Sequence, residues 1–84
     1  MSIFLEIPDA ITQAMRLPEH NQEQALLVEL AVSLYAQGVL SFGKARELAQ
    51  LDHYQFGQML GQRGISRHYT TEELTDDLNY AHRQ

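Results

Sequence analysis

The stretch from Ser41 to Gly64 limits the fold more than any other part of this sequence, because it holds start and stop signals for two short helices. Ser41 and Asp52 are residue types that cap helix N-termini, and Gln55 stands three positions after Asp52, as in a capping box. Gly64 suits the left-handed residue that follows a helix end. Only the residues around Gln50 separate the two helices, so the pair must cross steeply. This is the geometry of a helix-turn-helix.

Both helices of this segment have an apolar stripe at helical spacing. The first carries Phe42, Ala45, Leu48 and Ala49, and the second carries Phe56, Met59 and Leu60. Gly57 and Gly61 lie inside the second helix, where each costs about 1 kcal/mol relative to alanine, so we expect them to permit close backbone packing. The other face of the second helix is then the one offered to a partner.

The most apolar segment runs from Asn21 to about Gln37. Asn21 and Gln24 predict a capping box at its start, and Gly38 predicts its end. Its apolar residues leave only a narrow polar line on the helix: Leu26, Leu27, Val28, Leu30, Ala31, Val32, Leu34 and Tyr35. A helix that is apolar almost all round is enclosed, so we expect it to be the central core element. A dimer would account for the extent of its apolar surface.

The first residues predict a short strand. Ile3, Leu5 and Ile7 alternate with the intervening residues, and Pro8 ends the run. No second strand of similar quality follows, so this strand should pair with a second copy of the chain or with another protein. The alternative is an extended arm packed on the helices.

A short helix is expected between this strand and the central helix, over residues 9–15. It would bury Ala10, Ile11 and Ala14. It should end before Pro18, because proline disfavours a helical residue in front of it.

The last twenty residues are expected to form an arm and a terminal helix. Residues 65–69 look extended, with Arg67 and His68 exposed, and Thr70 and Glu73 make another capping-box pattern. In the terminal helix Leu74, Leu78 and Ala81 share one face. Three apolar side chains cannot hold such a helix in water unaided, so it must dock on its own domain or on a partner. Its acidic residues either suit a basic partner or complement the helix dipole.

Length and composition place these elements in one domain of mainly α class, residues 1–84. Residues 1–40 hold the strand and core helices and should mediate dimerisation, residues 41–64 form the helix-turn-helix, and residues 65–84 form the C-terminal arm and helix. A chain this short buries only roughly 60 to 65% of its unfolded surface, so support from a second copy or a partner is expected. No signal peptide is recognisable and no apolar run approaches the roughly 20 residues that span a bilayer, which predicts a cytoplasmic protein.

The residue types indicate a binding protein rather than an enzyme. There is no cysteine, and the four histidines lie too far apart for a short metal-ligand motif, so no metal and no cofactor are expected. The net charge of -5 argues against simple nucleic-acid binding. The charge is uneven, however: -4 over residues 1–40, +2 over residues 41–70 and -3 over residues 71–84. The only basic segment is therefore the helix-turn-helix candidate.

A resemblance to a known family covers nearly the full chain. It consists of the short strand ending in Pro8, an apolar helix ending in Leu34, Tyr35, Gln37 and Gly38, the run Leu40, Ser41, Gly43, Lys44, Ala45, Glu47, Leu48 and Ala49, and then Tyr69, Glu73, Leu74, Asp77 and Leu78. In this order the sequence resembles the UPF0175 family, whose members look like antitoxins encoded beside PIN-domain ribonuclease toxins. The resemblance implies a protein that neutralises a PIN-domain toxin and binds the shared operator DNA.

Two positions depart from that family's pattern. Arg46 stands where the family usually has a small residue, and Gln50 stands where it usually has a glycine. Both lie at the crossing of the paired helices. We expect Arg46 to extend outward and Gln50 to accept a different corner, because glycine takes the left-handed conformation most readily.

The leading hypothesis is a homodimer whose second paired helix enters a major groove of operator DNA. The residues that would hold phosphates are Lys44, Arg63 and Arg67, and those that would face base edges are His53, Gln55, Gln58 and Gln62. The alternative is a protein-interaction module or structural adaptor without DNA binding, in which those polar residues form a solvated face. The candidate partner-binding residues are Tyr69, Glu73, Leu74, Asp77 and Leu78.

Overall fold

The computed structural model describes residues 1–17 and 19–68. In these ranges the chain forms four α-helices, α1 (Asp9–Ala14), α2 (Gln22–Ala36), α3 (Phe42–Ala49) and α4 (His53–Gln62), with one 3-10 turn, η1 (Glu19–Asn21), before α2. No strand occurs in the same ranges. The predicted mainly helical class is confirmed. The predicted terminal helix and its capping box lie outside the described residues.

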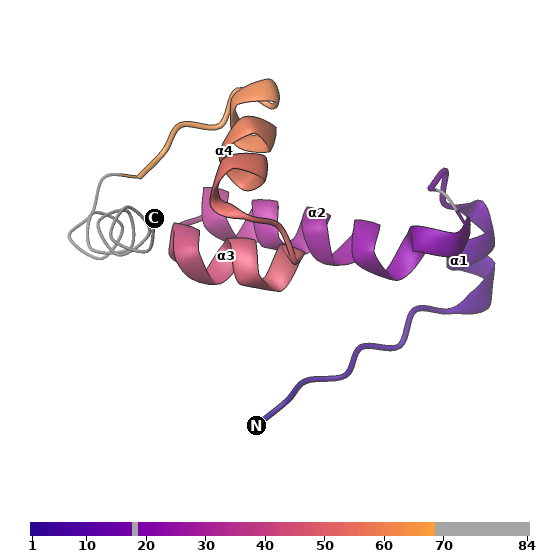
Figure 1. Cartoon of the computed structure of the whole chain (residues 1–84). Coiled ribbons are helices and arrows are strands. Elements are labelled where there is room, and N and C mark those ends of the chain that lie inside the picture. The colour runs from indigo at the N-terminus through magenta and orange to yellow at the C-terminus, as the bar shows by residue number, and fades with distance from the viewer. Residues whose placement is uncertain (18, 69–84) are drawn as a thin grey trace.

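The helices are arranged around α2, the longest of them. α3 returns along α2 after a short turn, and α4 crosses both at a steep angle (Figure 1). α1 lies at the far end of α2, away from α4, and the first residues run outward from it (Figure 1). The predicted steep crossing of the two paired helices is therefore present, with α2 as the platform beneath them.

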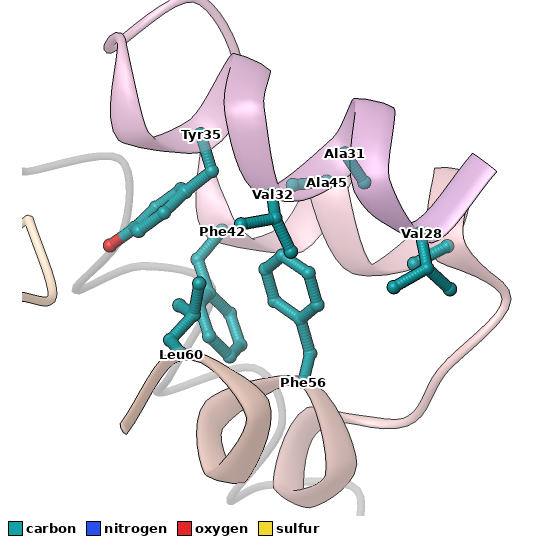
Figure 2. Packing of buried hydrophobic residues seen from close by; sticks show 9 residues of the cluster. Val28, Ala31, Val32, Tyr35, Phe42, Ala45, Phe56 and Leu60 are labelled. Atoms are coloured by element: carbon teal, nitrogen blue, oxygen red, sulfur yellow. The ribbon is translucent and has the colours of Figure 1, made fainter. Parts of the chain in front are cut away.

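The core lies where α2, α3 and α4 meet (Figure 2). Its members are Val28, Ala31, Val32, Tyr35, Phe42, Ala45, Ala49, Phe56 and Leu60. The rings of Tyr35, Phe42 and Phe56 come from three different helices and pack edge to face, with centroid distances of 5.3 to 6.2 Å. Edge-to-face pairs contribute about 0.5 to 1.5 kcal/mol beyond the burial of their area. The buried alanines of α3 let that helix approach α2 closely. The aromatic rings fill the space where α4 crosses these two helices.

Three of the helices end in the same hydrogen-bonded turn. After α2, α3 and α4 a residue with positive φ follows the last turn: Gly38 at 78°, Gln50 at 60° and Gly64 at 68°. In each case the next amide donates a hydrogen bond to a carbonyl five residues earlier, as in a Schellman motif. The predicted ends at Gly38 and Gly64 are confirmed. At Gln50 a residue with a Cβ adopts the conformation that glycine prefers.

The start of α2 differs from the prediction. Asn21 is the N-cap, but its side chain makes no capping hydrogen bond, so the predicted box with Gln24 is absent. Asn21 also closes the 3-10 turn, and its φ of -128° and ψ of 22° are not the extended conformation of a normal N-cap. Its side chain is therefore not positioned over the first turn of α2.

The outer face of α2 is not enclosed by the described residues. The helix buries Val28, Ala31, Val32 and Tyr35 against its neighbours, while Leu30 on the opposite side is 38% exposed. The expectation of a central core helix is confirmed for one face only, because α3 and α4 cover α2 from the same side.

The predicted N-terminal strand is not formed in the single chain, and its predicted pairing with a second copy or another protein stays a prediction. Residues 1–8 have no regular secondary structure and are exposed. A strand needs a neighbour for its backbone hydrogen bonds, and no other strand is present in the ranges described. The helix predicted over residues 9–15 is present as α1, but it buries none of its residues, so the expected burial of Ala10, Ile11 and Ala14 was wrong.

The two glycines of α4 do not both serve close packing. A Cβ added at Gly57 would lie 3.9 Å from Cζ of Phe42, an ordinary contact, so this glycine is beside the core. A Cβ at Gly61 would meet no atom within 4 Å among the described residues. The prediction therefore fails for Gly61, which faces solvent.

Candidate nucleic-acid interface

The α3–α4 pair is fixed by local hydrogen bonds at its two helix starts. The Ser41 hydroxyl accepts a hydrogen bond from the Lys44 amide at 3.3 Å. Asp52 and Gln55 form a complete capping box, in which the Gln55 amide donates to Asp52 Oδ1 at 2.7 Å and the Asp52 amide donates to Gln55 Oε1 at 3.1 Å. Both predicted caps are confirmed. Only residues 50–52 separate α3 from α4, so the turn between them is short.

One face of α4 is open and carries only uncharged polar groups. Phe56 and Leu60 point into the core, which turns the opposite side of the helix outward. The exposed side chains on it are Tyr54, Gln55, Gln58 and Gln62. Residues 53–62 contain no Lys, Arg, Asp or Glu. Glutamine side chains both donate and accept hydrogen bonds, as recognition of an adenine edge requires.

Tyr54 is the member of this face that the sequence-based prediction missed. It is 69% exposed and lies one helical turn before Gln58. An exposed tyrosine offers an apolar ring and a hydroxyl to a partner surface. The signal was its spacing of four residues from Gln58 and eight from Gln62, which places all three on one side of the helix.

The basic residues predicted to hold phosphates contact other parts of this chain. Lys44 forms an exposed ion pair with Glu47 at 3.2 Å. The guanidinium of Arg63 donates two hydrogen bonds to the carboxylate of Glu29, at 2.8 and 2.6 Å, which ties the end of α4 to α2. These hydrogen bonds hold the pKa of Glu29 below its usual value and raise that of Arg63, and desolvation opposes each shift. DNA would compete with Glu29 for Arg63.

The segment after α4 covers the aromatic core instead of projecting into solvent. The Arg67 guanidinium lies 3.7 Å from the centroid of the Phe42 ring, and the His68 ring stacks on Tyr35 at 4.5 Å. The His68 amide also donates a hydrogen bond to the Tyr35 hydroxyl at 2.6 Å. The prediction that Arg67 and His68 are exposed was wrong, because both are half-buried. Cation–π attraction and stacking to a buried ring are not visible in the sequence.

The remaining predicted residues fall into two groups. His53 is half-buried, with its ring 4.8 Å from that of Phe42, so it lies at the edge of the core rather than in the middle of the open face. Gln55, Gln58 and Gln62 lie together on that face as predicted. The candidate partner-binding residues Tyr69, Glu73, Leu74, Asp77 and Leu78 lie outside the described residues.

Two further properties of the described residues bear on function. No group of three or more His, Asp or Glu side chains gathers there in a way that could hold a metal ion. Over the same part of the chain, no helix has the length and apolar character that crossing a bilayer requires.

Comparison with known proteins identifies the family. The family model described as "Uncharacterised protein family (UPF0175)" matches residues 1–83. The chain belongs to the UPF0175 family. A UPF0175 protein of Aeropyrum pernix is 39% identical to it over 79 residues, covering 94% of this chain and 84% of the relative. A UPF0175 protein of Archaeoglobus fulgidus is 36% identical over 92% of this chain and 86% of the relative. One of Synechocystis is 32% identical over 95% of this chain and 85% of the relative. No solved structure matches it.

The two departures noted in the sequence have different outcomes in this UPF0175 chain. Gln50 does not change the corner, because its φ of 60° and ψ of 37° lie in the left-handed region that glycine favours. Arg46 is half-buried at the crossing, and its carbonyl accepts the hydrogen bond of the Leu51 amide. The turn between α3 and α4 therefore has a left-handed residue although that residue is glutamine.

Proposed function

We propose that this UPF0175 protein is a non-catalytic, antitoxin-like regulator that binds operator DNA through α3 and α4. The observation that carries the proposal is the open face of α4, which presents Tyr54, Gln58 and Gln62 from a helix whose start is fixed by a capping box. A helix of this kind, held across a second one by a short turn, is the arrangement that inserts into a major groove. The protein would act in the cytoplasm.

The charges predict how such binding would be shared between residues. Lys44 and Arg63 are exposed but paired with Glu47 and Glu29, so phosphate contacts would exchange one anion for another. A cation that must leave a carboxylate to reach a phosphate adds less to the affinity for DNA than a cation without such a pairing. Recognition would therefore depend more on base edges than it does in a strongly basic protein, and affinity would still fall as salt rises.

The test is fluorescence anisotropy with DNA from upstream of the protein's own gene. Gln58→Ala should weaken binding about tenfold or more, because a good bidentate contact to a base contributes about 1 to 3 kcal/mol of discrimination. Gln37→Ala is the matched control, since Gln37 is an exposed glutamine at the end of α2 whose side chain donates a hydrogen bond to the Ser33 hydroxyl. Two results together would rule out sequence recognition by α4: wild type and Gln58→Ala bind the upstream DNA with equal affinity, and wild type binds an unrelated DNA sequence with that same affinity.

The second candidate function is capture of a toxin partner. The family resemblance implies a PIN-domain ribonuclease, and the acidic segment at residues 71–84 has the charge to meet a basic surface. Observations that favour protein interaction over DNA binding are the pairing of Lys44 and Arg63 with carboxylates and the apolar residues exposed at the N-terminus.

Deletion of residues 71–84 separates the two roles. The shortened chain should lose co-purification with the PIN-domain product of a neighbouring gene while it retains DNA binding. If the nuclease still co-purifies with the shortened chain, residues 71–84 are not the binding segment, and the toxin contact must be sought elsewhere.

A further inference from the structure

The N-terminal residues carry apolar side chains that nothing in the described chain covers. Phe4 is 92% exposed, Ile3 79% and Leu5 72%, and Ile7 and Ile11 are also exposed. In an extended segment Ile3, Leu5 and Ile7 share one face, so a partner that covers this face would take three exposed apolar residues out of water.

The backbone of this segment also needs a partner. Residues 1–7 make no backbone hydrogen bond to any other part of the chain that the structure describes. Their side chains follow the period of two of a strand, with Ile3, Leu5 and Ile7 on one face. An extended segment with one apolar face and free amides is suited to pairing with another strand.

We propose that residues 2–7 of two copies pair as an antiparallel β-ribbon around a twofold axis at Leu5. In such a pair, directly opposite residues lie on the same face of the ribbon. Apolar residues of the two copies are therefore opposite one another only if the axis passes through a residue and not between two residues. With the axis at Leu5, Leu5 faces its own copy and Ile3 faces Ile7. An axis at Glu6 would oppose two carboxylates, which is unfavourable.

We infer that the partner is a second copy, because each chain supplies both a strand for the ribbon and a helix face, on α2, that can cover the ribbon. A two-stranded ribbon is only marginally stable until a helix covers its apolar face. The outer face of α2 supplies Leu26, Leu30 and Leu34 at intervals of four residues, and Leu30 is exposed in the single chain. The ribbon would cover these leucines. This explains why α2 is apolar on the side away from α3 and α4.

The dimer would present two copies of the open face of α4 to DNA, and in this respect the inference rests on the proposed function. Two α4 helices related by a twofold axis would read two half-sites of inverted sequence. The pairing itself does not depend on DNA, so it is tested without DNA.

The test uses the absence of cysteine from this chain. Leu5→Cys, Phe4→Cys and Glu6→Cys are purified separately and equilibrated in a glutathione redox buffer. Residue 5 lies directly opposite its copy, about 4.5 to 5.5 Å away between Cα atoms, whereas residues 4 and 6 lie about 7 to 8 Å from theirs. Disulfides rarely form beyond about 7 Å, so Leu5→Cys should give about tenfold more covalent dimer than either neighbour.

Sedimentation equilibrium of the cysteine-free chain provides the second measurement. Wild type should have twice the monomer mass, and Leu5→Lys should have the monomer mass with unchanged helical circular dichroism, because Leu5 lies outside the folded core. A monomeric wild type, or equal cross-linking at positions 4, 5 and 6, overturns the ribbon. Neither result bears on whether α4 binds DNA.

Discussion

The three-helix core and the N-terminal segment are both apolar, yet their burial is opposite. Tyr35, Phe42, Phe56 and Leu60 each expose less than 2% of their surface, whereas Phe4 exposes 92%. In the core, side chains from α2, α3 and α4 cover one another, so burial is complete within one chain. In residues 1–8 the pattern of a strand is present but its neighbour is not. Apolar patterning predicts which residues leave water, but not which molecule covers them.

The largest expected effect on stability is the difference between replacing a phenylalanine by alanine in the core and making the same replacement in the N-terminal segment. Phe56→Ala should destabilise the protein by about 3 to 5 kcal/mol, because it removes a fully buried ring that packs against Tyr35 and Phe42. Phe4→Ala should change the unfolding free energy of the monomer by less than about 0.5 kcal/mol. Urea denaturation in dilute solution measures both. Similar losses would mean that residues 1–8 pack on the core.

The second prediction compares the acidic residues that begin two helices. Asp52→Ala should destabilise by about 1 kcal/mol, because it removes the side-chain acceptor for the Gln55 amide. Asp9→Ala should cost only a few tenths of a kcal/mol, since Asp9 lies in the first turn of α1 but makes no side-chain cap. Thermal unfolding of the two variants at equal concentration checks the difference. Equal losses would show that α1 is as tightly coupled to the fold as α4.

Sequence reasoning succeeded where the cause is local. Ser41 and Asp52 begin helices, and Gly38 and Gly64 end them, because a cap needs only residues within a few positions of one another. The local rule failed at Asn21, where the preceding 3-10 turn changes the backbone at the cap. The helices, their order and the open glutamine face of α4 were thus predictable.

Contacts between distant residues were not predictable in the same way. Arg63 bonds Glu29, which lies 34 positions earlier, and Arg67 lies over Phe42. Both arginines are polar and look exposed in the sequence, so they were assigned to phosphates. Their actual partners depend on how α4 crosses α2, and this crossing follows from the packing of the whole core rather than from any short segment.

The third prediction concerns Gln50, the one residue that is not glycine among the three left-handed residues that follow α2, α3 and α4. Gln50→Gly should stabilise the protein by about 0.5 to 1 kcal/mol, because glycine adopts a φ of 60° without the steric cost that a Cβ brings. Gln37→Gly is the control. Gln37 has a φ of -82° at the end of α2, so glycine there should destabilise by a few tenths of a kcal/mol. A loss of stability in Gln50→Gly would mean that the Gln50 side chain itself stabilises the corner.

The smallest effect expected is that of the ion pair between α2 and α4. Glu29→Gln should cost about 0.5 kcal/mol at pH 7, since the pair is half-exposed and screened by solvent. The folded-state pKa of Glu29 is lowered, so its contribution is fully present above the unfolded pKa of about 4.3 and is lost as pH falls through the lower folded value. The difference between wild type and Glu29→Gln should therefore vanish in acid and shrink in about 1 M salt. Glu6→Gln, a change in the exposed N-terminal segment, should show no salt dependence, and a difference for Glu29→Gln that persists unchanged in acid and in high salt would assign its effect to packing rather than charge.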